Sequence, residues 1–248
     1  MLQLSRFAAL AVVAVGAVAC DDDDDDVGPS EPVATTFTVT IENVSTEGTL
    51  AVTRLDGVVP LSPGVYAVYT GANPLFSVSD SARAGEALER LAEDGDNSVL
   101  AEAIAGLSFL KSSGTFEAEG GPDASPLIFP GESATFTVTG IPGDRLQIAT
   151  MFVQSNDWFV ALGGIGVDLF NGSTPAEGDV TSRLVLYDAG TEADTPPGTG
   201  DDQAPVQAAP NTGAADPDSS VRVIVPDSLN GLPALSSIIR VTITTGQQ

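Results

Sequence analysis

Apolar and polar residues alternate in several short segments that follow residue 35. The clearest is Phe37-Thr38-Val39-Thr40-Ile41, in which every second side chain is apolar, as in a strand with one buried face. Similar segments predict strands at 49–52, 64–69, 134–138, 145–153, 180–187, 220–225 and 237–244. Pro-Gly pairs and other turn residues separate them. Short strands broken by turns in this way predict a mainly β fold, an antiparallel two-sheet β-sandwich.

One stretch between the strands has helical spacing instead. Residues 81–91 and 98–107 carry Ala, Leu and Glu at intervals of three and four, and Asp94-Gly95-Asp96 marks a turn between them. We expect a small helical insertion that packs on one end of the sandwich. Further along, residues 194–218 are rich in Pro, Gly, Asp and Ala and predict a long mobile loop.

The first 35 residues have a different composition. Residues 1–19 are typical of a signal peptide, because an apolar run at 7–19 is too short for a spanning helix, which needs about 20 residues. The run ends in Ala17-Val18-Ala19-Cys20, which resembles a bacterial lipobox and implies that Cys20 is lipidated; ordinary cleavage after Ala19 is the alternative. Six aspartates at 21–26 repel one another, so residues 20–35 are expected to form an extended, solvated tether.

Composition restricts the chemistry of the chain. The net charge is −25, and such a surface repels nucleic acid but is compatible with divalent cations or basic proteins. The sequence has no histidine, which excludes Ser-His-Asp and Cys-His catalysis and His-ligated metal sites. Cys20 is the single cysteine, so an internal disulfide is excluded. We therefore do not expect an enzyme.

Three motifs carry a resemblance to a known family. They are Leu61–Val68 followed by Pro74–Phe76, then Met151–Val160, which contains Ser-Asn-Asp-Trp-Phe-Val, and finally Leu186–Glu192, which reads Leu-Tyr-Asp-Ala-Gly-Thr-Glu. In this order they resemble the spondin N-terminal domain family, in its bacterial lipoprotein branch. The resemblance covers almost all of the predicted domain at 36–248. It implies a β-sandwich, in agreement with the strand pattern, and a role in adhesion or protein binding.

The resemblance also implies one calcium ion, held by Asp157, Asp188 and Glu192. Glu192 stands where the family's animal members usually have aspartate. The residues themselves are compatible with such a site, since a tight turn around Ala-Gly brings Asp188 and Glu192 together and calcium prefers hard oxygen ligands. Alternatively, Asp157 and Asp188 only cap loops by accepting hydrogen bonds from backbone N–H groups.

Two other features are given a structural interpretation. Glu93, Asp94 and Asp96 favour a solvated turn between helices over a second cation site, because no EF-hand series of ligands follows them. Trp158 is expected to be a core residue.

The sequence thus predicts a membrane-anchored lipoprotein of the cell envelope, on its periplasmic or cell-surface face, with a calcium-binding, spondin-like domain for adhesion or protein binding. Its expected contacts are the membrane, through the lipid on Cys20, and an extracellular or envelope protein. One alternative is a structural or accessory envelope protein without a discrete ligand. The other is a glycoside hydrolase that uses Asp157 and Asp188 as paired carboxylates.

Overall fold

A computed structural model describes residues 32–81, 86–120, 124–224 and 231–246. The predicted signal peptide, Cys20 and the tether up to residue 31 lie outside these ranges, as does Val225 at the end of one predicted strand.

Strands dominate the described residues. They are β1 (Thr35–Asn43), β2 (Leu61–Tyr69), β3 (Leu110–Phe116), β4 (Ser133–Gly140), β5 (Arg145–Phe152), β6 (Trp158–Leu162), β7 (Val167–Asp168), β8 (Phe170–Asn171), β9 (Thr174–Pro175), β10 (Gly178–Asp179), β11 (Leu184–Asp188), β12 (Arg222–Ile224) and β13 (Ile239–Thr245). The helices are α1 (Ala87–Asp94) and α2 (Ser98–Ile104), with short 3-10 helices at Arg54–Gly57, Thr181–Arg183 and Leu235–Ser237. In the part of the chain that the structure describes, neither α-helix combines the length and the apolar character that a membrane crossing requires.

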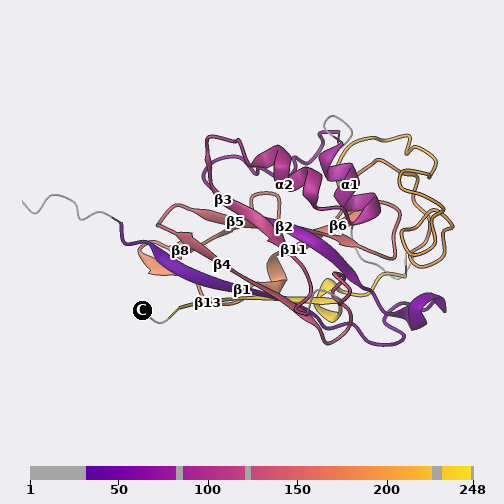
Figure 1. Cartoon of the computed structure of the whole chain (residues 1–248), viewed down its shortest axis with the longest axis horizontal. Helices are drawn as coiled ribbons and strands as arrows, with labels where there is room; N and C mark the ends of the chain where they lie inside the picture. The colour runs from indigo at the N-terminus through magenta and orange to yellow at the C-terminus, as the bar shows by residue number, and fades with distance from the viewer. Residues whose placement is uncertain (1–31, 82–85, 121–123, 225–230, 247–248) are drawn as a thin grey trace, which may run out of the picture. The chain divides into compact units, whose positions relative to one another are not determined.

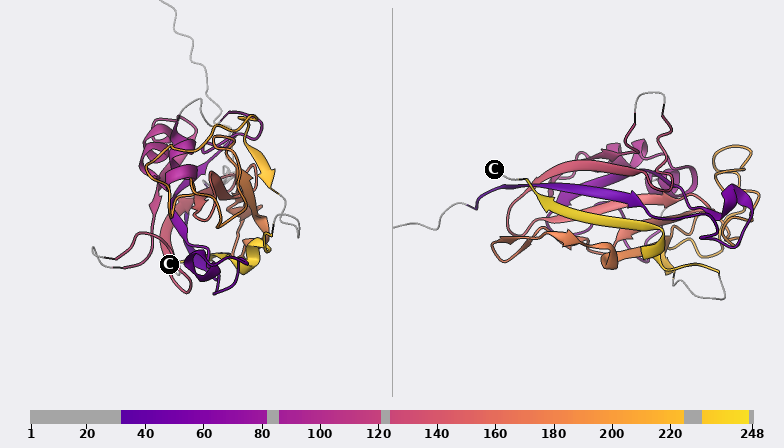
Figure 2. Two further views of the ribbon diagram at one scale, coloured as in Figure 1. Left: turned by 90° about the vertical axis from the view of Figure 1, so that its right-hand side faces the viewer. Right: turned by 90° about the horizontal axis from the view of Figure 1, so that it is seen from below.

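The strands form two main antiparallel sheets. The smaller has the order β10-β13-β1-β4, and the larger has the order β12-β11-β6-β5-β2-β3, with β7 beside β5. The short pair β8-β9 forms a separate hairpin. Strands β13, β1 and β4 lie side by side in Figure 2, and Figure 1 shows this layer below the larger sheet. The prediction of an antiparallel two-sheet β-sandwich is confirmed.

Strand β1 shows how the alternating sequence builds the core. Phe37, Val39 and Ile41 are completely buried, whereas the threonines between them are only half-buried. The register places Val39 opposite Ile243 and Ile41 opposite Val241 of β13, both also buried. These side chains form the core between the two sheets, which explains the period of two in the sequence.

The central strands of the larger sheet are buried on both faces. In β6, Val160 and Leu162 face the smaller sheet, while Phe159 and Ala161 belong to a second core beneath the helices. Helices α1 and α2 cover this outer face, as Figure 1 shows. The small helical insertion is confirmed, but it packs on a sheet face rather than on one end of the sandwich.

Several predicted boundaries were wrong for local reasons. Residues 49–52 form a bend rather than a strand, in which Leu50 is buried and its N–H donates to Gly57 O at 2.7 Å. The first helix begins at Ala87 rather than Ser81, which instead forms a bridge with Ser220. Strand β3 was missed because it is an edge strand with five consecutive polar or Gly positions at 111–115.

The long loop predicted at 194–218 is present and extends from Ala189 to Val221 between β11 and β12. It lies at the right-hand end of the sandwich in Figure 1. Hydrogen bonds attach it to neighbouring segments: Gly198 N–H donates to Gln154 O at 2.9 Å, and Gln207 Nε2 donates to Asp94 Oδ1 at 3.0 Å. The loop therefore has fixed contacts with both the β5–β6 connection and α1.

Candidate metal site

Three neighbouring strands bring the site together. In the larger sheet, Trp158 of β6 pairs with Asp188 of β11, and Asp188 pairs with Arg222 of β12. Cross-strand neighbours lie close enough for their side chains to interact. Asp157 directly precedes β6, and its backbone carbonyl accepts a hydrogen bond from Ala189 N–H at 3.1 Å. The second and third family-like motifs therefore meet at this end of the sheet.

A tight turn after Asp188 fixes two carboxylates. Gly190 has a φ of +70°, and a Cβ atom there would lie 2.6 Å from Ser220 O, so the turn requires glycine. Asp188 Oδ1 accepts a hydrogen bond from Gly190 N–H at 2.6 Å. Asp157 Oδ2 accepts bonds from the N–H groups of Thr191 and Glu192 at 2.6 and 3.0 Å. One oxygen of each aspartate thus has the loop-capping role that was one of the two interpretations.

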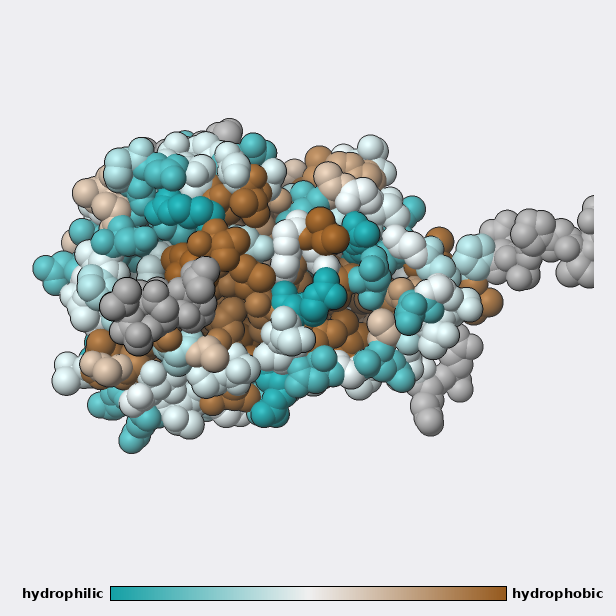
Figure 3. Space-filling view, turned by 180° about the vertical axis from the view of Figure 1, so that it is seen from behind, coloured by the Kyte–Doolittle hydropathy of each residue, from teal (hydrophilic) through white to brown (hydrophobic). Residues whose placement is uncertain are grey.

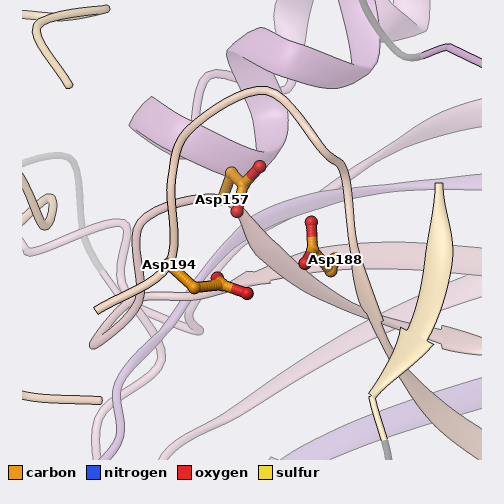
Figure 4. Close-up of side chains that lie close together, drawn as sticks. All are labelled: Asp157, Asp188 and Asp194. Carbon is orange, nitrogen blue, oxygen red and sulfur yellow. The ribbon is translucent and has the colours of Figure 1, made fainter. Parts of the chain in front are cut away.

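The same end of the sheet brings three carboxylates close together. Asp157, Asp188 and Asp194 each offer an oxygen, and these three atoms lie within 4.8 Å of one another (Figure 4). Asp157 is fully buried, and its Oδ1 has no hydrogen-bond partner. A buried polar atom without a partner is costly, so this oxygen is a favourable position for a ligand.

Asp194 is the third carboxylate of this group, whereas the sequence analysis named Glu192 as the third ligand. Glu192 is buried, but its Oε1 accepts from Gly213 N–H at 2.7 Å and its Oε2 from Asn156 Nδ2 at 3.3 Å. A β-bridge to Ala215 holds Glu192 against the long loop, and its carboxylate is not one of the three whose oxygens lie within 4.8 Å of one another. The only sequence signal for Asp194 was a further acid two residues after Glu192.

Arg222 supplies a positive charge within the cluster. Its Nη2 contacts Asp188 Oδ2, lies 2.6 Å from Asp216 Oδ2 and lies 3.7 Å from Asp194 Oδ2. Its Nη1 donates to the backbone carbonyl of Asp218 at 2.7 Å. Sequence analysis missed this residue, because the contact depends on the pairing of β12 with β11.

The environment disfavours negative charge on these groups. Burial raises the pKa of Asp157 to about 6, although hydrogen bonds from the Glu192 and Thr191 N–H groups act in the opposite direction. Burial also raises the pKa of Asp188, and the charges of Asp157 and Asp194 raise it further; the ion pair with Arg222 opposes that shift. A divalent cation would relieve both the burial penalty and the repulsion.

The cluster opens on a cavity of about 340 Å³, whose lining includes Trp158, Asp188, Asp194 and Arg222. The Trp158 side chain is only 4% exposed and packs in the inter-sheet core, which confirms its prediction as a core residue. Its Nε1 donates to Asp194 Oδ1 and orients that carboxylate. A small ion can therefore approach the cluster from one side.

The acids at the end of α1 are not part of a solvated turn. Glu93 is 1% exposed, and the Asp94 side chain is 7% exposed and pairs with Arg90 at 3.0 Å. Burial raises the pKa of Glu93 to about 7; a hydrogen bond with Thr191 opposes this shift, and the charges of Glu192, Glu89 and Asp157 add to it. The prediction of a solvated turn is wrong because α1 packs its last turn against the larger sheet.

A second concave region lies at the β11–β12 edge and has a different character. Figure 3 shows apolar surface on this face of the molecule. The groove has a volume of about 480 Å³ and is lined by Leu184, Val185, Leu186, Val223, Ile224, Leu232, Ala234 and Leu235. This lining contains no titratable side chain, so ionic chemistry belongs to the acidic end of the sandwich.

Comparison with protein-family models gives no match to this chain, and comparison with curated proteins gives none either. The resemblance to the spondin N-terminal domain family therefore stays a prediction that rests on the three motifs.

Proposed function

We propose that this protein is a cell-envelope lipoprotein, anchored through a lipid on Cys20, that presents a calcium-binding, spondin-like domain for adhesion or protein binding. The observation that carries the metal-binding part is the cluster of Asp157, Asp188 and Asp194, whose oxygens lie within 4.8 Å of one another. The acyl chains would hold the domain at the membrane, since two or more give durable anchoring.

The donor set fits calcium better than it fits softer metals. All three side chains offer hard carboxylate oxygens, and the described cluster contains no nitrogen or sulfur donor from His or Cys. Asp157 Oδ1, Asp188 and Asp194 would hold the ion. Calcium takes about 6–8 oxygen ligands, so backbone carbonyls and water would complete its shell.

A thermal-melting experiment on the full-length protein tests the site. Extracellular calcium modules bind with dissociation constants of about 0.1–1 mM, so a few millimolar calcium would stabilise the folded state by about 1.4 kcal/mol. For a domain of this size we expect a rise in melting temperature of about 3–6 °C, which chelator reverses and magnesium reproduces poorly.

Variants make this test specific. Asp157→Asn should abolish the rise and Asp188→Asn should remove a large part of it, because each change removes a ligand charge while it keeps the side-chain shape. Asp201→Asn is the matched control, since Asp201 is exposed and lies outside the cluster. Identical melting of the wild-type protein in calcium and in chelator would contradict the proposal.

Anchoring has its own test. Cys20→Ala should move the protein from the membrane fraction to the soluble fraction, because no other residue of this sequence can carry the thioether-linked lipid. Fractionation of expressing cells in high salt measures this. A variant that still sediments with membranes would show that lipidation of Cys20 is not the anchor.

One observation favours the structural alternative, an accessory envelope protein without a discrete ligand. Arg222 already places a positive charge against Asp188 and Asp194, so part of the repulsion is neutralised by the chain itself. If Arg222 is the permanent counter-charge, calcium leaves the melting temperature unchanged. The same melting experiment therefore decides between the two functions.

A further inference from the structure

We propose that Asp157 bridges two cation positions, and that a second divalent cation binds between Asp157 and Glu93, next to Glu192, on the α1 side of the cluster. This inference extends the proposed function, because Asp157 belongs to both positions. Calcium is the expected occupant, since the groups are again carboxylates.

Glu93 is the first support for this position. It lies in the last turn of α1, it is 1% exposed, and neither of its carboxylate oxygens accepts a hydrogen bond of ordinary geometry. The Thr191 hydroxyl interacts with Glu93 and also lies 3.1 Å from Asp157 Oδ2. One hydroxyl proton cannot satisfy both carboxylates, so the buried charge of Glu93 lacks adequate compensation.

The charges that act most strongly on Glu93 are those of Glu192, Glu89 and Asp157, all of them acidic. Arg90 also interacts with Glu93, but its guanidinium group is engaged by other carboxylates. Arg90, the one basic residue of α1, pairs with Asp94 at 3.0 Å and Asp96 at 3.1 Å. Within the described ranges, no ion pair reaches Glu93. A cation is the simplest species that would balance this group.

Asp157 is suited to act as the bridge. Its Oδ2 is occupied by Thr191 and Glu192, whereas its Oδ1 is buried and unpartnered. A carboxylate oxygen has two lone pairs, enough for one cation on each side. In Figure 4 the helical ribbon lies on the Asp157 side of the cluster, away from Asp194. Glu192 has one hydrogen bond on each oxygen and keeps further lone pairs for the second ion.

Counting bound calcium tests the inference. The full-length protein and its variants are compared by equilibrium dialysis against radioactive calcium up to about 5 mM, well above the expected dissociation constants. Glu93→Gln should bind about one calcium fewer per chain than the control Glu102→Gln, which removes the same charge from an exposed position on α2. The acidic tether is the same in every protein, so differences report only the folded domain.

A second variant separates the two proposals. Asp194→Asn removes a ligand of the first position only, and it should also bind about one calcium fewer than wild type. Loss in Asp194→Asn but not in Glu93→Gln overturns the second position and leaves the proposed function intact. Loss in Glu93→Gln alone supports the second position and contradicts the first. Absence of loss in both variants overturns both positions.

Folding is checked by near-ultraviolet circular dichroism. If Glu93→Gln does not fold, Glu93→Asp replaces it, because this change keeps the charge and withdraws it by one methylene group. One calcium should then bind about tenfold more weakly, which corresponds to about 1.4 kcal/mol. Unchanged affinity in a folded Glu93→Asp protein would overturn the second position.

Discussion

Carboxylates lie on both sides of Asp157, but their negative charges are compensated in different ways. On the sheet side, Asp188 and Asp194 face Arg222, which the pairing of β12 with β11 brings into contact with them. On the helix side, Glu93 and Glu192 are buried as deeply as Asp188, and no described basic residue forms an ion pair with either of them. The number of carboxylates is therefore a poor indicator of a cation site. The lack of compensation around a buried oxygen is the more informative observation.

The largest expected effect comes from removing the positive charge of Arg222, which lies within the carboxylate cluster. Arg222→Met leaves Asp188 and its neighbours without a counter-charge, and we expect the free energy of unfolding in chelator to fall by about 2–3 kcal/mol. Loss of one partner of a buried pair costs about 3–5 kcal/mol, and the partial exposure of Arg222 reduces this value. Urea unfolding measures the change.

Arg183→Met is the matched control, because Arg183 is exposed. Calcium should also stabilise Arg222→Met more than it stabilises the wild-type protein, since the ion then meets no competing guanidinium group. If Arg222→Met is as stable as the control in chelator, the two sides of Asp157 do not differ in the way described above.

On the helix side of Asp157, Glu93 should make the free energy of unfolding depend on pH. The pKa of Glu93 in the folded state is about 7, above the ordinary value of 4.5, so the folded state binds the proton more tightly than the unfolded state does. The stabilisation that comes from proton binding to Glu93 is therefore fully present below about pH 4.5 and is lost as the pH rises through 7. Between pH 8 and pH 5, without calcium, Glu93 should contribute an increase of about 2–3 kcal/mol in the free energy of unfolding.

Glu93→Gln should lack this part of the pH dependence and should be more stable than the wild-type protein at pH 8. Titration of Asp157, whose pKa is about 6, continues in both proteins, so the difference between the two curves isolates Glu93. Parallel curves from pH 5 to pH 8 would show that the folded state does not raise the pKa of Glu93.

The smallest effect is expected at Glu192. Glu192→Gln keeps an oxygen that can accept the Gly213 N–H bond, so the loop stays attached and only a charge is lost. We expect a stability change within about 1 kcal/mol, and a calcium-induced melting shift reduced by less than in Asp188→Asn. A complete loss of the shift would place Glu192 among the ligands of the first position, as the family resemblance implies.

Much of the fold followed from the sequence because alternation directly reports a strand with one buried face, as in β1. Strands β5 and β6 are buried on both faces and β3 is an edge strand, so for these the boundaries or the strand itself depended on contacts that a local pattern does not contain. Asp157 and Asp188 were found because they belong to compact motifs. Arg222 and Glu93 reach the site through strand register and helix packing, which arise only in the folded chain.

Trp158 makes the carboxylate cluster accessible to fluorescence measurements. It is the only tryptophan of the chain, and its indole N–H is bonded to Asp194 at the edge of the carboxylate cluster. Its fluorescence emission therefore reports on one end of the sandwich without any attached label. An ion that pulls Asp194 toward Asp157 and Asp188 weakens that bond and changes the polarity around the indole, whereas an ion held by Glu93 acts on the opposite side of the sheet. The emission spectrum should thus report cation binding at the first position and should not change when a cation binds at the second.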